Sequence, residues 1–427
     1  MKPRIIPRLL LSEVIAHLRN PEITIITGAR QVGKTVLLEM VKDYLVKNRG
    51  ILAEDILYFN LDIIKDWEFF QDQGKLIEFL RMRSEGKKIY VFVDEAQKVA
   101  DCARFFKGVY DSHLNVKLIL TGSSSLELKA GLKESLSGRK RLFSLSSFCF
   151  SEFLTAKDKS LAELLKSRSK IPIIERKRLI SYFEEYSIWG GYPKAALARS
   201  QKEKLAVLAE IYSSYIEKDI VGLLEIKNKM GFSNLARLLS GQIGQLVNVA
   251  ELSNALKLDR GTVERYLWAL EETFIIKPLI PFYKNPRQEI IKQNKVYFYD
   301  PGLRNYCLED FHHLDLRADR GFVLENSVFK EMLLFLRIFQ KIRFWRTKQG
   351  SEVDFVVFEK DNCLPIEVKL HLKKTIVPVG LKNFIAKYKP KKAAIVNLDF
   401  FDREVKIGKS KIYFIHPYEL EDMLKKV

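Results

Sequence analysis

The stretch Gly28-Ala29-Arg30-Gln31-Val32-Gly33-Lys34-Thr35 decides the fold of the first third of the chain. It matches the phosphate-binding pattern GxxxxGK[ST], in which backbone N–H groups wrap a phosphate, the lysine reaches its oxygens and the threonine hydroxyl binds Mg2+. A β-rich run, residues 22–28, leads into it, and apolar residues at helical spacing follow it. We predict a strand, a phosphate-binding loop, and a helix whose N-terminus favours an anion.

Two further apolar strands carry polar residues at their ends. Residues 89–93 lead into Asp94, predicted to support Mg2+, and Glu95, predicted to polarise the attacking water as a general base. Residues 116–121 lead into a serine-rich stretch, in which Ser123 is the candidate reporter on a γ-phosphate. A plain loop is the alternative there. ATP and Mg2+ are therefore the expected cofactors.

The run from Arg8 to about Phe153 resembles the AAA+ ATPases, specifically a stand-alone prokaryotic group that reads GxRQVGKT, a strand plus DE, LTGSS and SxxGR. Ala29 stands where proline is frequent in that group. The resemblance implies an α/β fold with a five-stranded parallel core. It also implies that Arg139 acts as an arginine finger in a neighbouring subunit of a homo-oligomer. A solvated basic cluster is the alternative for Arg139.

A largely helical segment, residues 156–225, is predicted to form a lid over the nucleotide. One interruption, Trp189-Gly190-Gly191-Tyr192-Pro193, breaks its helical pattern. The interruption resembles a Gly-x-Pro element of related ATPases, which implies that Gly191 and Pro193 contact the nucleotide. A loop joining two helices has the same composition and remains the alternative.

Residues 226–285 are predicted to form a winged helix-turn-helix, with helices near 248–258 and 262–270 and wing strands within 274–282. The second helix has an apolar face and leaves several polar or aromatic residues outward, namely Arg260, Thr262, Arg265 and Trp268. Such a helix can enter a major groove, so DNA is a predicted partner. Packing against the lid or another protein is the alternative, because glutamates dilute the basic face.

The last segment, residues 286–427, contains a predicted hairpin of strands 352–358 and 364–370. If its turn centres on Lys360-Asp361, facing residues have numbers that sum to 721, and Asp354 stands opposite Glu367. Lys369 then lies two residues on, on the same face of the sheet. Two carboxylates beside one lysine suit a site for one or two Mg2+ ions with phosphate chemistry.

The constellation resembles the PD-(D/E)xK nuclease fold over about residues 320–400. We expect Asp354 and Glu367 to bind metal, Glu325 on the preceding helix to complete the metal shell, and Lys369 to orient water or stabilise the phosphate. Two alternatives stay open. The domain binds without cutting, as many domains of this shape do, or the three strand residues form a salt-bridged sheet face.

Composition sets the frame for these modules. The 427 residues are 47% hydrophobic and 29% charged, which is typical of a folded multidomain protein. The net charge of +19 is spread as +6, +6 and +7 over residues 1–150, 151–300 and 301–427. An even distribution fits DNA contact by several modules better than one basic arm, although a solubilising surface is the alternative.

Four separated cysteines and no long apolar stretch favour a reducing, cytoplasmic location without membrane contact. We expect four domains: an ATPase core at 1–155, a lid, a winged helix, and a nuclease-like domain of α/β restriction-endonuclease type. The leading hypothesis is an ATP-hydrolysing protein that binds or processes DNA. The alternative is a nucleotide-switched regulatory module whose nuclease-like domain is inactive.

Overall fold

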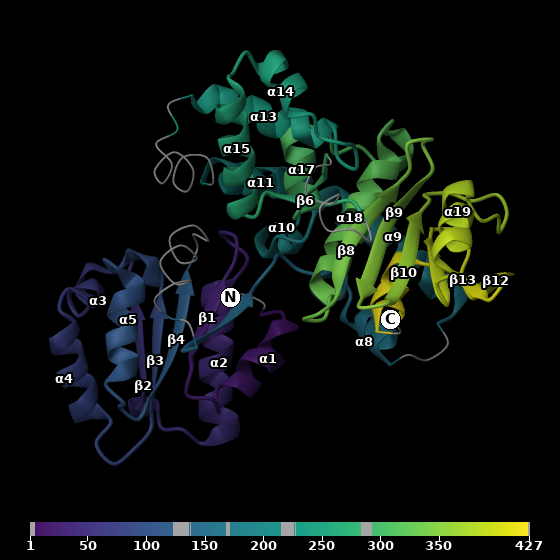
Figure 1. The fold of residues 1–427 in the computed structure, drawn as a ribbon. Helices are drawn as coiled ribbons and strands as arrows, with labels where there is room; N and C mark the ends of the chain where they lie inside the picture. Colours follow the sequence, from purple (N-terminus) through teal and green to yellow (C-terminus); the bar gives the residue numbers. More distant parts are fainter. Residues whose placement is uncertain are drawn as a thin grey trace. The chain divides into compact units, whose positions relative to one another are not determined.

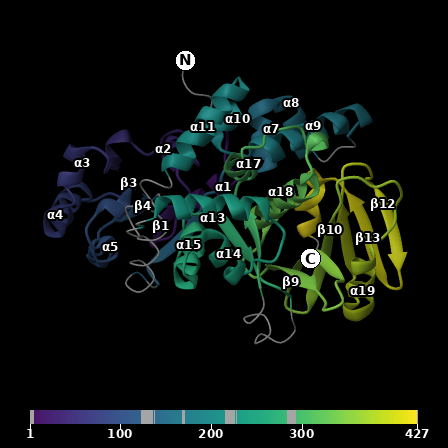
Figure 2. The ribbon, with the colours of Figure 1, turned by 90° about the horizontal axis from the view of Figure 1, so that it is seen from above.

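The computed structural model divides the chain into two compact units, residues 1–147 and 148–427 (Figures 1 and 2). Each unit is described by itself. The described residues are 5–122, 136, 138–167, 171–214, 226, 228–282 and 293–425. The predicted γ-phosphate reporter, Ser123, lies outside them.

A five-stranded parallel sheet forms the centre of the first unit, in the order β2-β3-β4-β1-β5. Every residue of β1 and β3 is buried, as expected for a parallel sheet covered on both faces. The α/β fold with a parallel core is confirmed. The strands are β1 (Ile23–Thr27), β2 (Ile56–Asn60), β3 (Ile89–Asp94), β4 (Val116–Gly122) and β5 (Lys140–Ser144).

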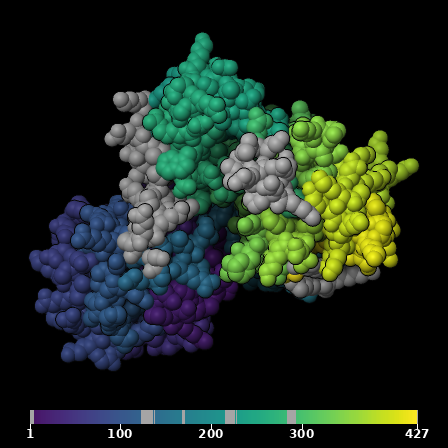
Figure 3. Space-filling view, in the orientation of Figure 1, coloured from purple at the N-terminus to yellow at the C-terminus, as the bar shows by residue number. Residues whose placement is uncertain are grey.

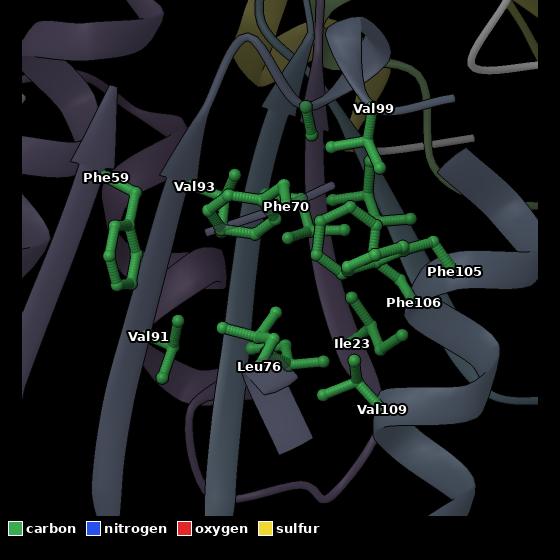
Figure 4. Packing of buried hydrophobic residues seen from close by; sticks show 14 of the residues in the cluster. Ile23, Phe59, Phe70, Leu76, Val91, Val93, Val99, Phe105, Phe106 and Val109 are labelled. Atoms are coloured by element: carbon green, nitrogen blue, oxygen red, sulfur yellow. The ribbon is translucent and has the colours of Figure 1, made fainter. Parts of the chain in front are cut away.

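Helices cover both faces of this sheet. On one face, α4 (Gln73–Arg83) and α5 (Cys102–Asp111) supply Leu76, Phe105, Phe106 and Val109 to a core shared with Ile23, Val91 and Val93 (Figure 4). The opposite face carries α1 (Leu10–His17), whose His17 hydrogen-bonds Thr24, and α2 (Lys34–Arg49), which contacts β4. Full burial of each large apolar side chain contributes about 1.5–3 kcal/mol.

Parallel pairing brings three strand ends to one edge of the sheet. Thr27 pairs with Gly122, and Val93 pairs with Leu120, so the loop after β1, Asp94 and the end of β4 share that edge. The N-terminal segment, purple in Figure 3, lies against blue residues of the same unit. At that sheet edge, residues that are distant in sequence therefore lie near the predicted phosphate loop.

The second unit begins with helices. Their mutual packing is extensive: α17 contacts α9, α11 and α13, and α18 contacts α9. The helices are α7 (Phe150–Lys157), α8 (Lys159–Lys166), α9 (Ile173–Trp189), α10 (Pro193–Leu197), α11 (Gln201–Ser214), α13 (Lys229–Gly241), α14 (Val249–Leu256), α15 (Arg260–Glu272), α17 (Pro301–Leu308) and α18 (Arg320–Phe335). Because α7 belongs to this unit, the unit boundary falls before the predicted limit at residue 155.

Helices α14 and α15 occur where the helix-turn-helix pattern predicts them, each with an Asn or Asp cap. A two-stranded antiparallel sheet follows, formed by β6 (Ile276–Leu279) and β7 (Lys295–Phe298). Strand β7 lies within the predicted last domain, 286–427, and pairs with β6 of the preceding predicted domain, while α17 after it packs on α9 and α13. Strand pairing therefore crosses the predicted limit at residue 285.

A six-stranded mixed sheet dominates the rest of the second unit, in the order β12-β13-β11-β10-β9-β8. Helix α19 (Val379–Tyr388) packs on one face through Leu381, Phe384 and Ile385. The strands are β8 (Lys341–Arg346), β9 (Glu352–Glu359), β10 (Asn362–Val368), β11 (Lys392–Val396), β12 (Arg403–Ile407) and β13 (Ser410–Ile415). Helix α20 (Leu420–Leu424) follows this sheet in the sequence and contacts α18. No helix among the described residues is both long and apolar enough to cross a membrane.

Candidate nucleotide site and a carboxylate-lysine cluster

The loop between β1 and α2 needs glycine at both ends. A Cβ on Gly28 would lie 2.1 Å from the carbonyl oxygen of Leu145, so only glycine fits there. Gly33 has φ of 94°, a left-handed conformation that L side chains rarely adopt, and it is the N-cap of α2. The loop thus runs tightly from the strand end into a helix N-terminus, the arrangement that binds a phosphate.

Lys34 folds back over this loop. Its Nζ donates to the carbonyl oxygens of Gly28, at 3.0 Å, and Ala29, at 2.7 Å, and the side chain is buried. The ammonium is therefore held above the loop whose N–H groups would surround a phosphate. This is the position that the sequence pattern predicts for a lysine acting on β and γ oxygens.

Asp94 is the centre of a hydroxyl cluster at the same sheet edge. Its Oδ2 accepts hydrogen bonds from Thr35 Oγ1, at 2.7 Å, and Tyr58 Oη, at 3.2 Å, and its Oδ1 accepts one from Thr121 Oγ1. Burial, reinforced by the negative charge of Asp94, raises the pKa of Tyr58. The structure thus joins the loop threonine to the strand-end carboxylate. Both groups offer oxygen ligands of the kind that Mg2+ prefers.

Glu95 follows in a left-handed backbone conformation with φ of 58°. Its carboxylate accepts a hydrogen bond from Gln97 Nε2, and its backbone N–H donates to Thr121 Oγ1 at 3.3 Å. Positive φ is rare for a non-glycine residue and costs about 1–3 kcal/mol, so it points to a constrained site. The action of the Glu95 carboxylate on a water stays a prediction.

Sequence reasoning missed Tyr58, Thr121 and Arg8. Thr121 carried a readable signal, a hydroxyl at the end of an apolar strand that neighbours the strand of Asp94. Arg8 carried none, because it lies 24 residues before the carbonyl that it contacts. Its guanidinium donates to Val32 O, at 2.7 Å, and to Ser146 O, at 2.6 Å, and it is 7% exposed. It therefore fastens the phosphate loop to the segment after β5.

Replacing Arg8 by alanine should weaken nucleotide binding about 10-fold to 100-fold, because each charge-assisted hydrogen bond contributes about 1.5–3 kcal/mol. Arg8→Lys should recover part of the affinity, since an ammonium can still reach one carbonyl. Fluorescent nucleotide titration of the full chain gives the Kd. Arg19→Ala, at an exposed position of the same segment, is the matched control. An unchanged Kd for Arg8→Ala would contradict a positioning role.

Arg139 lies at the opposite edge of the sheet from the loop of its own unit. Its carbonyl accepts a hydrogen bond from Ile23 N, at the start of β1, and its Nε donates to Asp111 Oδ1 at 2.7 Å. The loop begins at the other end of β1, about 16 Å away along a five-residue strand. Action in a neighbouring subunit stays a prediction.

The second unit contains the hairpin expected near the carboxylates. Its register runs from Asn362 opposite Glu359 to Ile366 opposite Phe355, so facing residues sum to 721 as predicted. Asp354 Oδ2 accepts a hydrogen bond from Val368 N at 2.7 Å, and Lys369 Nζ lies 2.7 Å from Glu367 Oε1. Asp354, Glu367 and Lys369 thus form one cluster, in which the two carboxylates are buried and the Lys369 side chain is 40% exposed.

Glu325 is near this cluster but engaged elsewhere. Its carboxylate accepts a hydrogen bond from the Tyr297 hydroxyl and lies 3.8 Å from Lys295 Nζ. Burial, with the charge of Asp354 second, raises the pKa of Glu325 to about 8. In the part of the chain that the structure describes, no three His, Cys, Asp or Glu side chains are placed to hold a metal ion. The predicted shell that adds Glu325 to the strand carboxylates is therefore absent from this arrangement.

Asp354 and Glu367 by themselves still suit a hard cation. Burial and the charge of Asp354 raise the pKa of Glu367 to about 7. Glu367 Oε2 is buried and finds no hydrogen-bond partner among the described residues. An orphaned carboxylate oxygen beside a second carboxylate fits a divalent ion that takes its remaining ligands from water or phosphate.

The Gly-x-Pro interruption is built into the second unit. Gly191 N donates to Asp300 Oδ2 at 2.9 Å, and a Cβ on Gly191 would lie 2.2 Å from Phe148 O. Pro193 begins α10. These contacts account for the glycine through packing within its own unit, and the predicted nucleotide contact of Gly191 and Pro193 stays a prediction.

Helix α15 buries Val263, Tyr266 and Leu270, as its apolar spacing predicts, and leaves Trp268 46% exposed. Arg260 pairs with Glu264 at 3.0 Å on the outward face. The exposed face therefore carries Trp268, Arg265 and an Arg260 that is paired with a glutamate, which suits either of the predicted partners, DNA or protein.

Comparison with known families finds matches for three segments of the chain. Residues 20–154 match a family described as AAA domain. Residues 180–313 and 320–415 match two families described as Domain of unknown function (DUF8612) and Domain of unknown function (DUF4143). The first of these runs from within α9 past α17, in agreement with the packing of those helices.

Two relatives align over most of the chain. An uncharacterized protein of Haemophilus influenzae is 29% identical over 382 residues, covering 85% of this chain and 86% of the relative. An uncharacterized protein of Methanocaldococcus jannaschii is 26% identical over 383 residues, covering 88% and 81%. Among solved structures, the ORC2 protein of Aeropyrum pernix in its ADP form covers 78% of this chain and 97% of its own, at 15% identity and a TM-score of 0.37.

The family match over residues 20–154 and the geometry of the phosphate loop point to the same type of domain. The first unit has a parallel α/β core with a phosphate loop, and residues 20–154 resemble the family described as AAA domain. Its phosphate loop, Lys34, and the Thr35–Asp94 pair form the candidate nucleotide site.

Proposed function

We propose that this chain binds and hydrolyses ATP in its first unit and uses nucleotide state to control DNA binding by its second unit. The hydrogen bond of 2.7 Å between Thr35 Oγ1 and Asp94 Oδ2 carries the first half of this proposal. It joins the phosphate loop to a strand-end carboxylate, the pair of elements that P-loop ATPases use to hold a metal beside the phosphates.

The residues suit Mg2+ and ATP in defined roles. Backbone N–H groups of residues 28–33 would surround the phosphates, Lys34 would neutralise their charge, and Thr35 and Asp94 would hold the ion and its waters. Bound Mg2+ supplies charge neutralisation of the phosphates. Glu95 orients the attacking water and accepts its proton, and Arg8 keeps the loop in shape.

Glu95→Gln tests this assignment of roles. Hydrolysis should fall at least 100-fold, because an amide cannot accept the proton of the attacking water, whereas the Kd for ATP should stay within about threefold. Steady-state turnover and nucleotide titration of the same preparation measure the two quantities. Glu85→Gln, an exposed acid of the same unit, should match the wild type. Retained turnover in Glu95→Gln would exclude the general-base role.

The second half of the proposal places DNA on the second unit. Outward residues of α15 and the net positive charge of the chain support it. The Asp354–Glu367–Lys369 cluster favours phosphodiester cleavage as a candidate activity, because Glu367 Oε2 is buried without a partner among the described residues.

The competing candidate is a nucleotide-switched interaction module without cleavage. The ion pair between Lys369 and Glu367, and the diversion of Glu325 to Tyr297, favour it. Mg2+-dependent cutting of duplex DNA that disappears in Lys369→Ala and persists in Lys34→Ala would select the nuclease. DNA that is bound and never cut would select the module.

A further inference from the structure

One corner of the C-terminal sheet concentrates positive charge. From Lys387 to Lys411 the sequence has eight basic and three acidic residues. Two of the acids are engaged elsewhere, since Asp399 accepts from His371 and Leu372 and Asp402 pairs with Arg176. The corner therefore carries a local excess of lysine that nearby carboxylates do not balance.

The fold brings these lysines together from two separate segments of the chain. Ser410 Oγ donates to Pro390 O, and Lys411 N donates to Lys391 O at 3.1 Å, so the turn between β12 and β13 is tied to the segment before β11. We define the basic corner as six lysines on these two segments, all exposed except the half-buried Lys392: Lys389, Lys391, Lys392, Lys406, Lys409 and Lys411.

Three lysines of the basic corner face one another directly across neighbouring strands. Lys392 of β11 pairs with Lys411 of β13, and Lys411 pairs with Lys406 of β12. Directly opposite residues share a sheet face about 5 Å apart, and like charges in that position are destabilising. Lys411 also lies 3.5 Å from the exposed Glu404, which offsets part of this repulsion. Such an arrangement gains stability when a polyanion covers it.

The chemistry of the basic corner favours a phosphodiester backbone over other anions. Residues 380–425 include no strongly exposed large hydrophobic side chain, so an apolar anchor for a membrane or a protein interface is absent from this described segment. Lysine binds phosphate as a point charge without demanding a fixed orientation. A row of such charges suits the regularly spaced phosphates of nucleic acid.

The corner is separate from the carboxylate cluster. Strands β10 and β11 are parallel, with Glu367 beside Ile395, so Lys392 lies three residues back, about 10 Å along the sheet. We propose that the basic corner is a duplex-DNA binding surface that supplies affinity away from the Asp354–Glu367–Lys369 cluster. This inference rests on the proposed DNA function of the second unit.

The test is the salt dependence of binding to a fluorescent 20-base-pair duplex by the full chain. The triple variant Lys406→Gln, Lys409→Gln, Lys411→Gln should bind at least tenfold more weakly near 100 mM salt. Its log–log salt slope should fall by about 3, one for each lysine. The matched control removes three exposed lysines from helices of the same unit, Lys166→Gln, Lys177→Gln and Lys202→Gln, and should keep the wild-type slope.

The outcomes separate this inference from the function on which it rests. A triple variant that binds like the wild type would overturn the inference alone, and so would a control variant that loses as much affinity. A wild type that binds no duplex would overturn both the inference and the proposed DNA function. It would leave the proposed ATPase function untouched, because that function is assigned to the first unit. Misfolding is excluded by thermal unfolding, where the triple variant should match or exceed the wild type because like-charge repulsion is removed.

Discussion

Replacing Lys34 by alanine is expected to lower ATP turnover at least 100-fold. Lys34 Nζ is held over the loop by Gly28 O and Ala29 O, in the place where it would meet phosphate oxygens. A fixed charge aimed at a transferring phosphoryl group is worth about 3–4 kcal/mol or more of transition-state stabilisation, and alanine offers nothing in its place.

The fold should survive this change, because Lys34 Nζ contacts Gly28 O and Ala29 O within the phosphate loop and not the hydrophobic core of the unit. Turnover is measured by phosphate release at saturating ATP, and ATP affinity by titration. Lys42→Ala, on the exposed side of the same helix, is the matched control and should behave like the wild type. Turnover in Lys34→Ala within twofold of the wild type would mean that this loop is not the hydrolytic site.

The second large effect is expected in the helical core of the second unit. Asp300→Ala should lower its free energy of unfolding by about 3–5 kcal/mol, the cost of breaking a buried ion pair. Asp300 lies 3.0 Å from Lys330 Nζ, and the two side chains are 2% and 1% exposed. The carboxylate also accepts the N–H groups of Gly191, Gly302 and Leu303. Without the Asp300 carboxylate, the buried Lys330 ammonium loses its ion-pair partner, and three backbone N–H groups lose their hydrogen-bond acceptor.

Tryptophan fluorescence reports on this transition, because Trp189, Trp268 and Trp345 lie in the second unit and only Trp67 lies in the first. Denaturant titration of the full chain gives the change, analysed as two units. Asp315→Ala, at a side chain 61% exposed, should cost less than about 1 kcal/mol. A similarly small loss for Asp300→Ala would refute the assignment of this pair as a central support.

Local pattern made the phosphate loop and the hairpin predictable. The glycines, lysine and threonine of residues 28–35 follow a fixed local spacing that can be read from the sequence. In the hairpin, a period of two fixes the facing residues once the turn is placed. Arg8 was not predictable, because its contact with Val32 O arises only when the N-terminal segment packs beside β5.

Three other positions also have partners that are distant in sequence. Strand β7 falls in the predicted last domain, 286–427, whereas its partner strand β6 lies before residue 280. Glu325 lies on the helix predicted to complete the metal shell, but its carboxylate contacts Tyr297 and Lys295 instead. The sequence around Gly191 is typical of a ligand-binding loop, and in the structure Gly191 lies against Phe148 O and donates to Asp300. Competition among distant partners decided each of these positions.

The central claim is that Thr35 and Asp94 complete a Mg2+-dependent ATPase site with the phosphate loop. The most direct measurement is ATP turnover by the wild-type full chain with Mg2+ and with the ion chelated, beside Asp94→Asn. We predict turnover that requires Mg2+ and falls at least 100-fold in Asp94→Asn. Absence of turnover in the wild type, or turnover that persists without Mg2+ or without the Asp94 carboxylate, would contradict the claim.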